Sequence, residues 1–162
     1  MFHFLEQIMV IGGVYAAGKT TEVFRNGSVV RCNVSALQEA WADQASAVVP
    51  DGVVICGGRN HQHSCLRLTS ENQWVPFPDL NLRWRGYFDM FYMNEKLWAI
   101  GGDKGIEYID PSSGSGWTIV PPRPNPRTDR GCSAELPNNR IIFTGGSGKP
   151  VGSNSFFSHV SE

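Results

Sequence analysis

The chain has 162 residues, of which 41% are hydrophobic and 18% are charged, and its formal net charge is −1. This balance provides no overall field that would attract nucleic acid or an anionic membrane, and a chain of this length can bury one ordinary core. No apolar run approaches the roughly 20 residues of a membrane helix. Residues 1–6 have no basic region and no small-residue cleavage site, so we expect no signal peptide.

Short strand-favouring runs, separated by turn residues, follow one another along the chain. Turn signals at Asn26-Gly27 and Asp51-Gly52 predict hairpins, and residues 36–41 could form one helical turn. The expected strands cover residues 8–11, 22–24, 29–32, 53–56, 65–68, 74–77, 86–93, 97–100, 106–110, 117–120, 131–136, 141–144 and 156–157. Many short strands with Gly- and Pro-rich turns indicate an all-β chain.

One phrase of four strand-favouring residues closed by two glycines occurs four times. The glycine pairs are Gly12-Gly13, Gly57-Gly58, Gly101-Gly102 and Gly145-Gly146. The phrases start at positions 8, 53, 97 and 141, so successive copies lie 45, 44 and 44 residues apart. A fixed period of this size, with about four short strands in each unit, is typical of a β-propeller blade.

These units resemble the kelch repeat, in which a strand ending in Gly-Gly is followed by an aromatic residue and then by Trp, with a period of about 50 residues. The matching residues are Gly57-Gly58 with Trp74, Gly101-Gly102 with Tyr108 and Trp117, and the pairs Arg85-Gly86 and Arg130-Gly131 at the start of an inner strand. The resemblance covers nearly all of residues 1–162, which we treat as a single region.

The resemblance implies an all-β fold of kelch-type β-propeller blades. We expect about three four-stranded antiparallel blades plus part of a fourth. Kelch propellers have about five to seven blades, so the chain is expected to be a fragment; the alternative is closure by pairing with a second copy. Eleven residues are expected to serve the repeat structurally: Gly12, Gly13, Gly57, Gly58, Trp74, Gly101, Gly102, Tyr108, Trp117, Gly145 and Gly146.

Four cysteines, Cys32, Cys56, Cys65 and Cys132, fit neither a Cys-x-x-Cys site nor a dense disulfide framework. We expect them to be reduced thiols, mostly buried in strands, in a cytoplasmic protein. Two glycosylation sequons, at Asn26 and Asn33, would suit the alternative, an extracellular protein whose parent chain carries a signal peptide.

Residues 13–20, Gly-Val-Tyr-Ala-Ala-Gly-Lys-Thr, match the phosphate-binding loop of nucleotide-binding proteins. That loop works only where a helix follows the lysine, because the amides at the helix N-terminus bind the phosphates. Here the hairpin signal Asn26-Gly27 arrives a few residues after Lys19 and leaves no room for a helix. We therefore interpret this stretch as a loop of the first repeat and expect no cofactor.

His61, His63 and Cys65 alternate and could direct their side chains to one metal ion, but no fourth ligand is evident. The alternative is a polar loop that contacts a partner. No nucleophile motif or paired carboxylates are apparent, so we expect no catalytic residue and no metal site. Galactose oxidase shares the kelch propeller and holds copper, and a galactose-oxidase-like or carbohydrate-active propeller enzyme is the alternative function.

In a kelch blade, the loop after Gly-Gly and the loop that leads to the next inner strand open on the same face. By this mapping 9 of the 14 basic residues share one face, together with fewer acidic residues. Arg beside aromatic side chains is typical of binding hot spots. The expected partner-binding residues are Arg59, His61, His63, Arg83, Trp84, Lys104, Arg123 and Arg127. The alternative is that these loops are simply charged and solvated.

The sequence therefore predicts a non-enzymatic protein-interaction module. Its propeller loops would bind a peptide or an acidic segment of a protein partner, and neither nucleic acid nor a membrane. If the parent chain resembles the BTB-kelch proteins, the module could belong to a ubiquitin-ligase substrate adaptor.

Overall fold

The computed structural model describes residues 7–13, 18–26, 28–30, 34–83, 86, 88–101, 105–121, 131–145 and 155–158. Within these ranges the regular structure consists of fourteen short strands, apart from one 3₁₀ turn at residues 18–19. All pairings between these strands are antiparallel. The prediction of an all-β chain built from four-stranded antiparallel sheets is confirmed. None of the described segments forms a helix that is long and apolar enough to cross a membrane.

Two sheets have four strands, in sequence order from the inner to the outer edge. The second sheet contains β4 (Ala45–Val49), β5 (Gly52–Cys56), β6 (Cys65–Leu68) and β7 (Trp74–Phe77). The third sheet contains β8 (Phe88–Met93), β9 (Lys96–Gly101), β10 (Gly105–Ile109) and β11 (Thr118–Val120). In both, the strand that ends at the repeated glycines is the second of the four.

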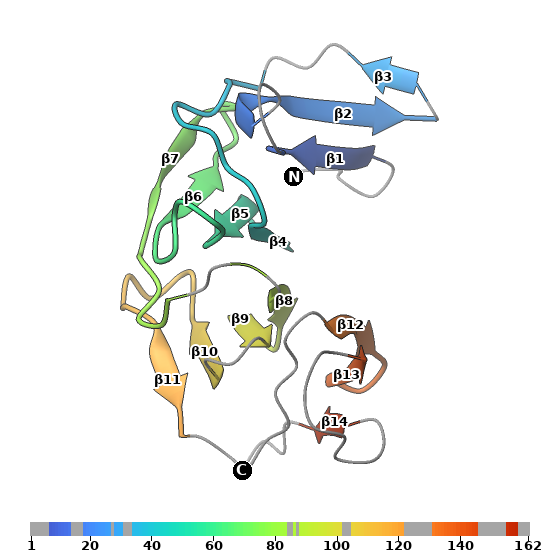
Figure 1. Cartoon of the computed structure of the whole chain (residues 1–162), viewed down its shortest axis with the longest axis vertical. Helices are drawn as coiled ribbons and strands as arrows, with labels where there is room; N and C mark the ends of the chain where they lie inside the picture. Colours follow the sequence, from blue (N-terminus) through green and yellow to red (C-terminus); the bar gives the residue numbers. More distant parts are fainter. Residues whose placement is uncertain are drawn as a thin grey trace.

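The two remaining sheets have three described strands each. The first sheet contains β1 (Gln7–Ile11), β2 (Thr21–Arg25) and β3 (Ser28–Val30), and the fourth contains β12 (Gly131–Leu136), β13 (Arg140–Gly145) and β14 (Ser155–Ser158). Among the described residues, the first sheet has no counterpart of β4, and the fourth has no counterpart of β7. Figure 1 shows the four sheets following one another around an open arc that does not close into a ring.

The core lies between successive sheets rather than within one of them. Alternate side chains of β5 face opposite neighbours: Val54 and Cys56 belong to the cluster shared with the third sheet, and Ile55 belongs to the cluster shared with the first. The same alternation occurs in β9, where Ala99 faces the second sheet and Trp98 packs toward Ile141 of the fourth. Strands buried on both faces read as continuous apolar runs, which explains the repeated phrase.

The first sheet is covered on one face only. Val23 is buried, and Ile11 packs against the cluster shared with the second sheet. On the other face, Ile8 is 70% exposed and Val29 is 63% exposed. This sheet stands at the end of the arc in Figure 1, so its outer face has no neighbouring sheet among the described residues.

The predicted helical turn at residues 36–41 is wrong. The backbone N–H of Leu37 donates to Lys19 O (3.0 Å), and the N–H of Trp41 donates to Gly18 O (2.8 Å). These amides therefore bond to the loop of the first sheet instead of to carbonyls one helical turn earlier. Both side chains are buried, so tertiary packing outweighs the local helical tendency.

The prediction that the cysteines are reduced is also wrong for two of the four. Cys56 and Cys65 form a disulfide, and their Cα atoms lie 4.2 Å apart. The residues are directly opposite each other in the register of β5 and β6, which brings the two sulfur atoms together. Cys32 and the side chain of Cys132 lie outside the described residues. The hairpin turn predicted at Asp51-Gly52 lies one residue earlier, because Val49 pairs with Gly52.

Candidate partner-binding face

Three connections meet at the end of the sheets where β5 finishes. They are residues 34–44 before β4, residues 57–64 between β5 and β6, and residues 78–83 after β7; we call them together the loop face. Backbone hydrogen bonds join them: Arg59 N donates to Ala42 O (2.9 Å), and Leu80 N donates to His63 O (2.8 Å). The loop face is thus one connected surface, although its segments come from different hairpins.

The glycine pairs allow these loops to approach closely. Gly12, Gly13, Gly57, Gly58 and Gly101 all have positive φ. A Cβ atom on Gly58 would lie 2.4 Å from Ala42 O, closer than real Cβ contacts. Only glycine permits both this backbone conformation and this approach. Gly145 ends β13, and Gly102 and Gly146 lie outside the described residues.

The tryptophans named from the repeat pack between sheets. Trp117 is 6% exposed in the cluster between the second and third sheets, and its indole N–H donates to Pro78 O (2.8 Å). Trp74 packs against the cluster between the first and second sheets. Tyr108 is partly buried between the third and fourth sheets, 4.9 Å from the ring of Trp98. These side chains lie in the core and not on the loop face.

His61 lies flat against the segment that precedes β4. Its ring stacks on Trp41 with centroids 4.2 Å apart and an interplanar angle of 8°. Its Nε2 lies 3.1 Å from Ala40 O, and the Glu39 carboxylate is 3.6 Å from the same nitrogen. His61 therefore fixes residues 39–41 against the β5–β6 loop.

His63 connects the same loop to the segment after β7. Its Nδ1 lies 2.9 Å from Leu80 O, and its Nε2 accepts a hydrogen bond from Arg83 Nε (3.0 Å). Because a carbonyl oxygen can only accept, Nδ1 must carry the proton and Nε2 must present its lone pair to Arg83. The contacts thus define a neutral tautomer, and the ring orients the exposed guanidinium of Arg83.

Arg59 is held at the surface by a carboxylate of the neighbouring segment. Its Nε and Nη2 both donate to Asp43 Oδ2, at 3.1 and 2.8 Å. The Arg59 side chain remains 62% exposed. An exposed ion pair of this kind contributes little to stability, so a second carboxylate could compete for the guanidinium at small cost.

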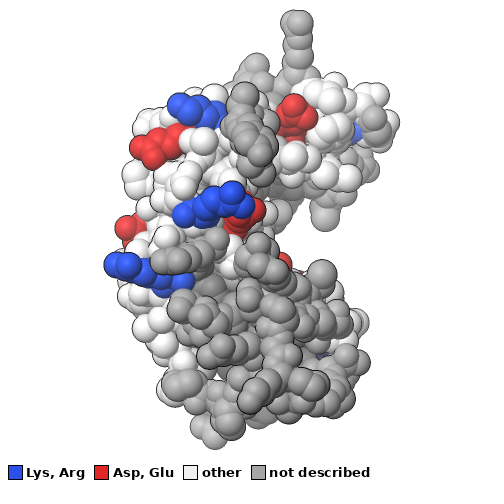
Figure 2. Space-filling model, in the orientation of Figure 1, with Lys and Arg blue, Asp and Glu red and all other residues white. Residues whose placement is uncertain are grey.

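The structure brings together four of the eight residues that the sequence predicts for partner binding. Arg59, His61 and His63 share the β5–β6 loop, and Arg83 contacts His63. Trp84, Lys104, Arg123 and Arg127 lie outside the described residues. On the side that Figure 2 draws, the described basic side chains form separate patches with acidic atoms close beside them, rather than one continuous basic surface.

The side chains that could have formed a metal site point in different directions. His61 contacts Ala40, His63 contacts Leu80, and Cys65 is bonded to Cys56. In the described ranges, no group of three or more His, Cys, Asp or Glu side chains could hold a metal ion.

The stretch that matches a phosphate-binding loop is followed by a strand. Thr21 begins β2 only two residues after Lys19. The amide of Gly12 donates to Thr20 O (2.9 Å), and the amide of Gly13 donates to Trp41 O (2.8 Å). These two amides are engaged within the fold, and no α-helix begins in the described residues 18–26 to present its N-terminus to a phosphate. Residues 14–17 lie outside the described part.

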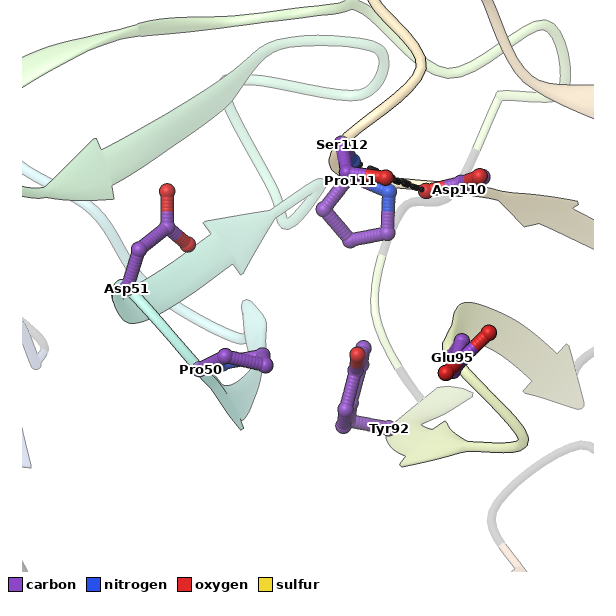
Figure 3. A pocket seen from close by; sticks show the side chains of 7 residues that line it. All are labelled: Pro50, Asp51, Tyr92, Glu95, Asp110, Pro111 and Ser112. Atoms are coloured by element: carbon purple, nitrogen blue, oxygen red, sulfur yellow. Dashed lines mark hydrogen bonds between the residues drawn. The ribbon is translucent and has the colours of Figure 1, made fainter.

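Sequence reasoning missed a hollow at the opposite ends of the second and third sheets. Its volume is about 410 Å³, and Tyr92 lies in it between Pro50 and Glu95 in the view of Figure 3. Asp51, Glu95 and Asp110 bring three carboxylates to its wall. The sequence shows these acids as scattered, at spacings of 44 and 15 residues. Only the period of about one repeat between Asp51 and Glu95 could have indicated that their turns are neighbours.

A scan against protein-family models finds no match to this chain, and a search of curated proteins also finds none.

Proposed function

We propose that this chain is a non-enzymatic protein-interaction module of kelch-type propeller repeats, and that its loop face binds a peptide or an acidic segment of a protein partner. The observation that carries the proposal is the network of contacts that orders this face. His61 and His63 bond to carbonyls of two different neighbouring segments, and the Arg59 and Arg83 guanidinium groups remain at the surface.

A surface that is ordered before binding loses less conformational entropy when a partner docks. Guanidinium groups bind carboxylates through paired hydrogen bonds, so the chemistry of this face suits aspartate or glutamate side chains. Asp43 already accepts two hydrogen bonds from the Arg59 guanidinium, both at its Oδ2. A partner carboxylate would take over or extend the same contact.

A place in a ubiquitin-ligase substrate adaptor would require an intracellular setting, and the disulfide argues against that setting. Disulfides persist in oxidising compartments, so the Cys56–Cys65 bond favours the extracellular alternative over the cytoplasmic one.

The test is a titration of the full chain with a fluorescein-labelled peptide of alternating glutamate and glycine. Arg83→Glu should weaken binding about tenfold, equivalent to about 1.4 kcal/mol, because it replaces an attractive charge by a repulsive one. The matched control is Arg140→Glu, an exposed arginine at the turn end of β13, which should leave binding unchanged. Equal affinities of the wild type and Arg83→Glu would refute the proposal, provided that thermal unfolding shows both to be folded.

A further inference from the structure

The hollow on the other side of the molecule is built from three tight turns. Pro50 and Asp51 form the turn between β4 and β5, Glu95 lies in the turn between β8 and β9, and Asp110 and Pro111 follow β10. These turns are at the ends of the strands opposite to the loop face. A volume of about 410 Å³ lies within the range of small-ligand clefts.

The polar wall of the hollow is negatively charged. Asp51 forms an ion pair with Arg67. The other two carboxylates of the wall belong to Glu95 and Asp110. In the described part of the chain, no cation forms an ion pair with Glu95 or Asp110. The ammonium of Lys96 lies over the ring of Tyr108, 4.6 Å from its centroid, and its positive charge also contributes to lowering the pKa of Asp110.

Asp110 is fixed in an ionised, oriented state. Its Oδ1 accepts hydrogen bonds from the amide of Ser112 (2.8 Å) and from the Ser112 hydroxyl (2.7 Å). These hydrogen bonds, the hydroxyl's first, hold the pKa of Asp110 below its ordinary value. The carboxylate is therefore charged at neutral pH, and both serine donors occupy the same one of its two oxygens.

The remaining wall is aromatic and apolar. Figure 3 shows Tyr92 standing between Pro50 and Glu95, with Pro111 across the hollow. Burial, and then the charges of Glu95, Asp110 and Asp51, raise the pKa of Tyr92, so its phenol stays neutral. A neutral aromatic ring beside carboxylates attracts a cation both through its face and through the surrounding charge.

We propose that this hollow binds the positively charged side chain of an arginine or lysine in a basic segment of a protein partner. The carboxylates of Glu95 and Asp110 would receive the charged head. Tyr92 and the two prolines would cover the aliphatic stem, which long basic side chains bury along apolar surface. The aromatic ring and the two prolines favour an organic cation over a bare divalent ion, because such an ion has no apolar part for them to cover. The site is separate from the loop face. It would bind a basic segment, whereas the loop face is proposed to bind an acidic one.

The experiment is a backbone-amide NMR titration of the full chain with an acetylated, amidated peptide of alternating arginine and glycine. The proposal expects shifts of the amide signals of residues 51–52, 92–95, 110 and 112–113. Glu95→Gln should weaken binding about threefold or more, and Tyr92→Leu should weaken it as well, because each removes one part of the recognition. Glu71→Gln is the matched control, since Glu71 is an exposed glutamate in the β6–β7 turn.

Three results would overturn the proposal: no shifts around the hollow, shifts confined to another surface, or an equal loss of affinity in Glu71→Gln and Glu95→Gln. A parallel titration with butylguanidinium distinguishes a peptide side chain from a free organic cation. The peptide should bind more tightly, because its flanking backbone adds contacts. Equal affinity would show that the hollow binds a free organic cation and would overturn the assignment of a protein partner. None of these outcomes depends on whether the loop face binds acidic peptides.

Discussion

Gly58 belongs to a repeated glycine pair, and its lack of a side chain allows two segments of the loop face to approach closely. Its φ is +103°, and an added Cβ would lie 2.4 Å from Ala42 O. Gly58→Ala should therefore lower the free energy of unfolding by about 1–3 kcal/mol, measured by urea denaturation. Gly116→Ala is the control, because no heavy atom lies within 4 Å of its Cβ position. An equal effect of the two substitutions would contradict the role given to Gly58.

Asp110 gives a residue-scale prediction about pH. Its pKa is lowered in the folded chain, so this carboxylate stabilises the fold above its unfolded pKa, and the contribution is lost as pH falls through the lower folded value. Ser112→Ala removes one donor and should raise the pKa of Asp110, as followed by carboxyl NMR titration. Ser70→Ala should instead raise the pKa of Glu71, whose pKa is lowered first by the Ser70 hydroxyl. No change at Asp110 in Ser112→Ala would contradict this assignment.

The segment after β7 depends on one buried carboxylate of the neighbouring sheet. Glu107 in β10 is fully buried and accepts hydrogen bonds from Asn81 N (2.9 Å) and Leu82 N (3.2 Å). Glu107→Gln places an amide where two N–H groups converge, so it should cost about 1–3 kcal/mol of stability. Hydrogen exchange at Asn81 and Leu82 should become faster. Unchanged exchange there, or an equal effect of the exposed Glu135→Gln, would show that Glu107 does not hold this segment.

Many of the strands could be predicted from the sequence. Strands predicted at residues 65–68, 74–77 and 131–136 have the same bounds in the structure, because alternation and turn residues define them locally. The segment at residues 36–41 could not be predicted, since its amides bond to a loop of another sheet. The disulfide was missed because it depends on strand register, which Cys spacing does not reveal.

The candidate site was predictable to a smaller extent. The positions of Arg59, His61, His63 and Arg83 in the repeat predicted that they share one face. The repeat could not show that both histidines contact backbone carbonyls. The hollow around Tyr92 was missed altogether. Its acids come from three turns that only sheet-on-sheet packing brings together.

At the scale of the whole molecule, the open arc separates two surfaces of different chemistry. The connections after the glycine pairs lie at one end of the strands, and the hairpin turns lie at the other. The first end presents Arg59 and Arg83, and the second presents Glu95 and Asp110. The same stack of sheets therefore carries both proposed binding surfaces.

The central claim, that the loop face is the surface that binds an acidic segment, is tested most directly by mapping where such a peptide binds. Backbone-amide NMR of the full chain, titrated with the glutamate–glycine peptide, should show the largest shifts at residues 57–64 and 79–83. The amide signals of residues 51–52 and 92–95 should not move. Shifts absent from the loop face, or concentrated on the turn side, would contradict the account.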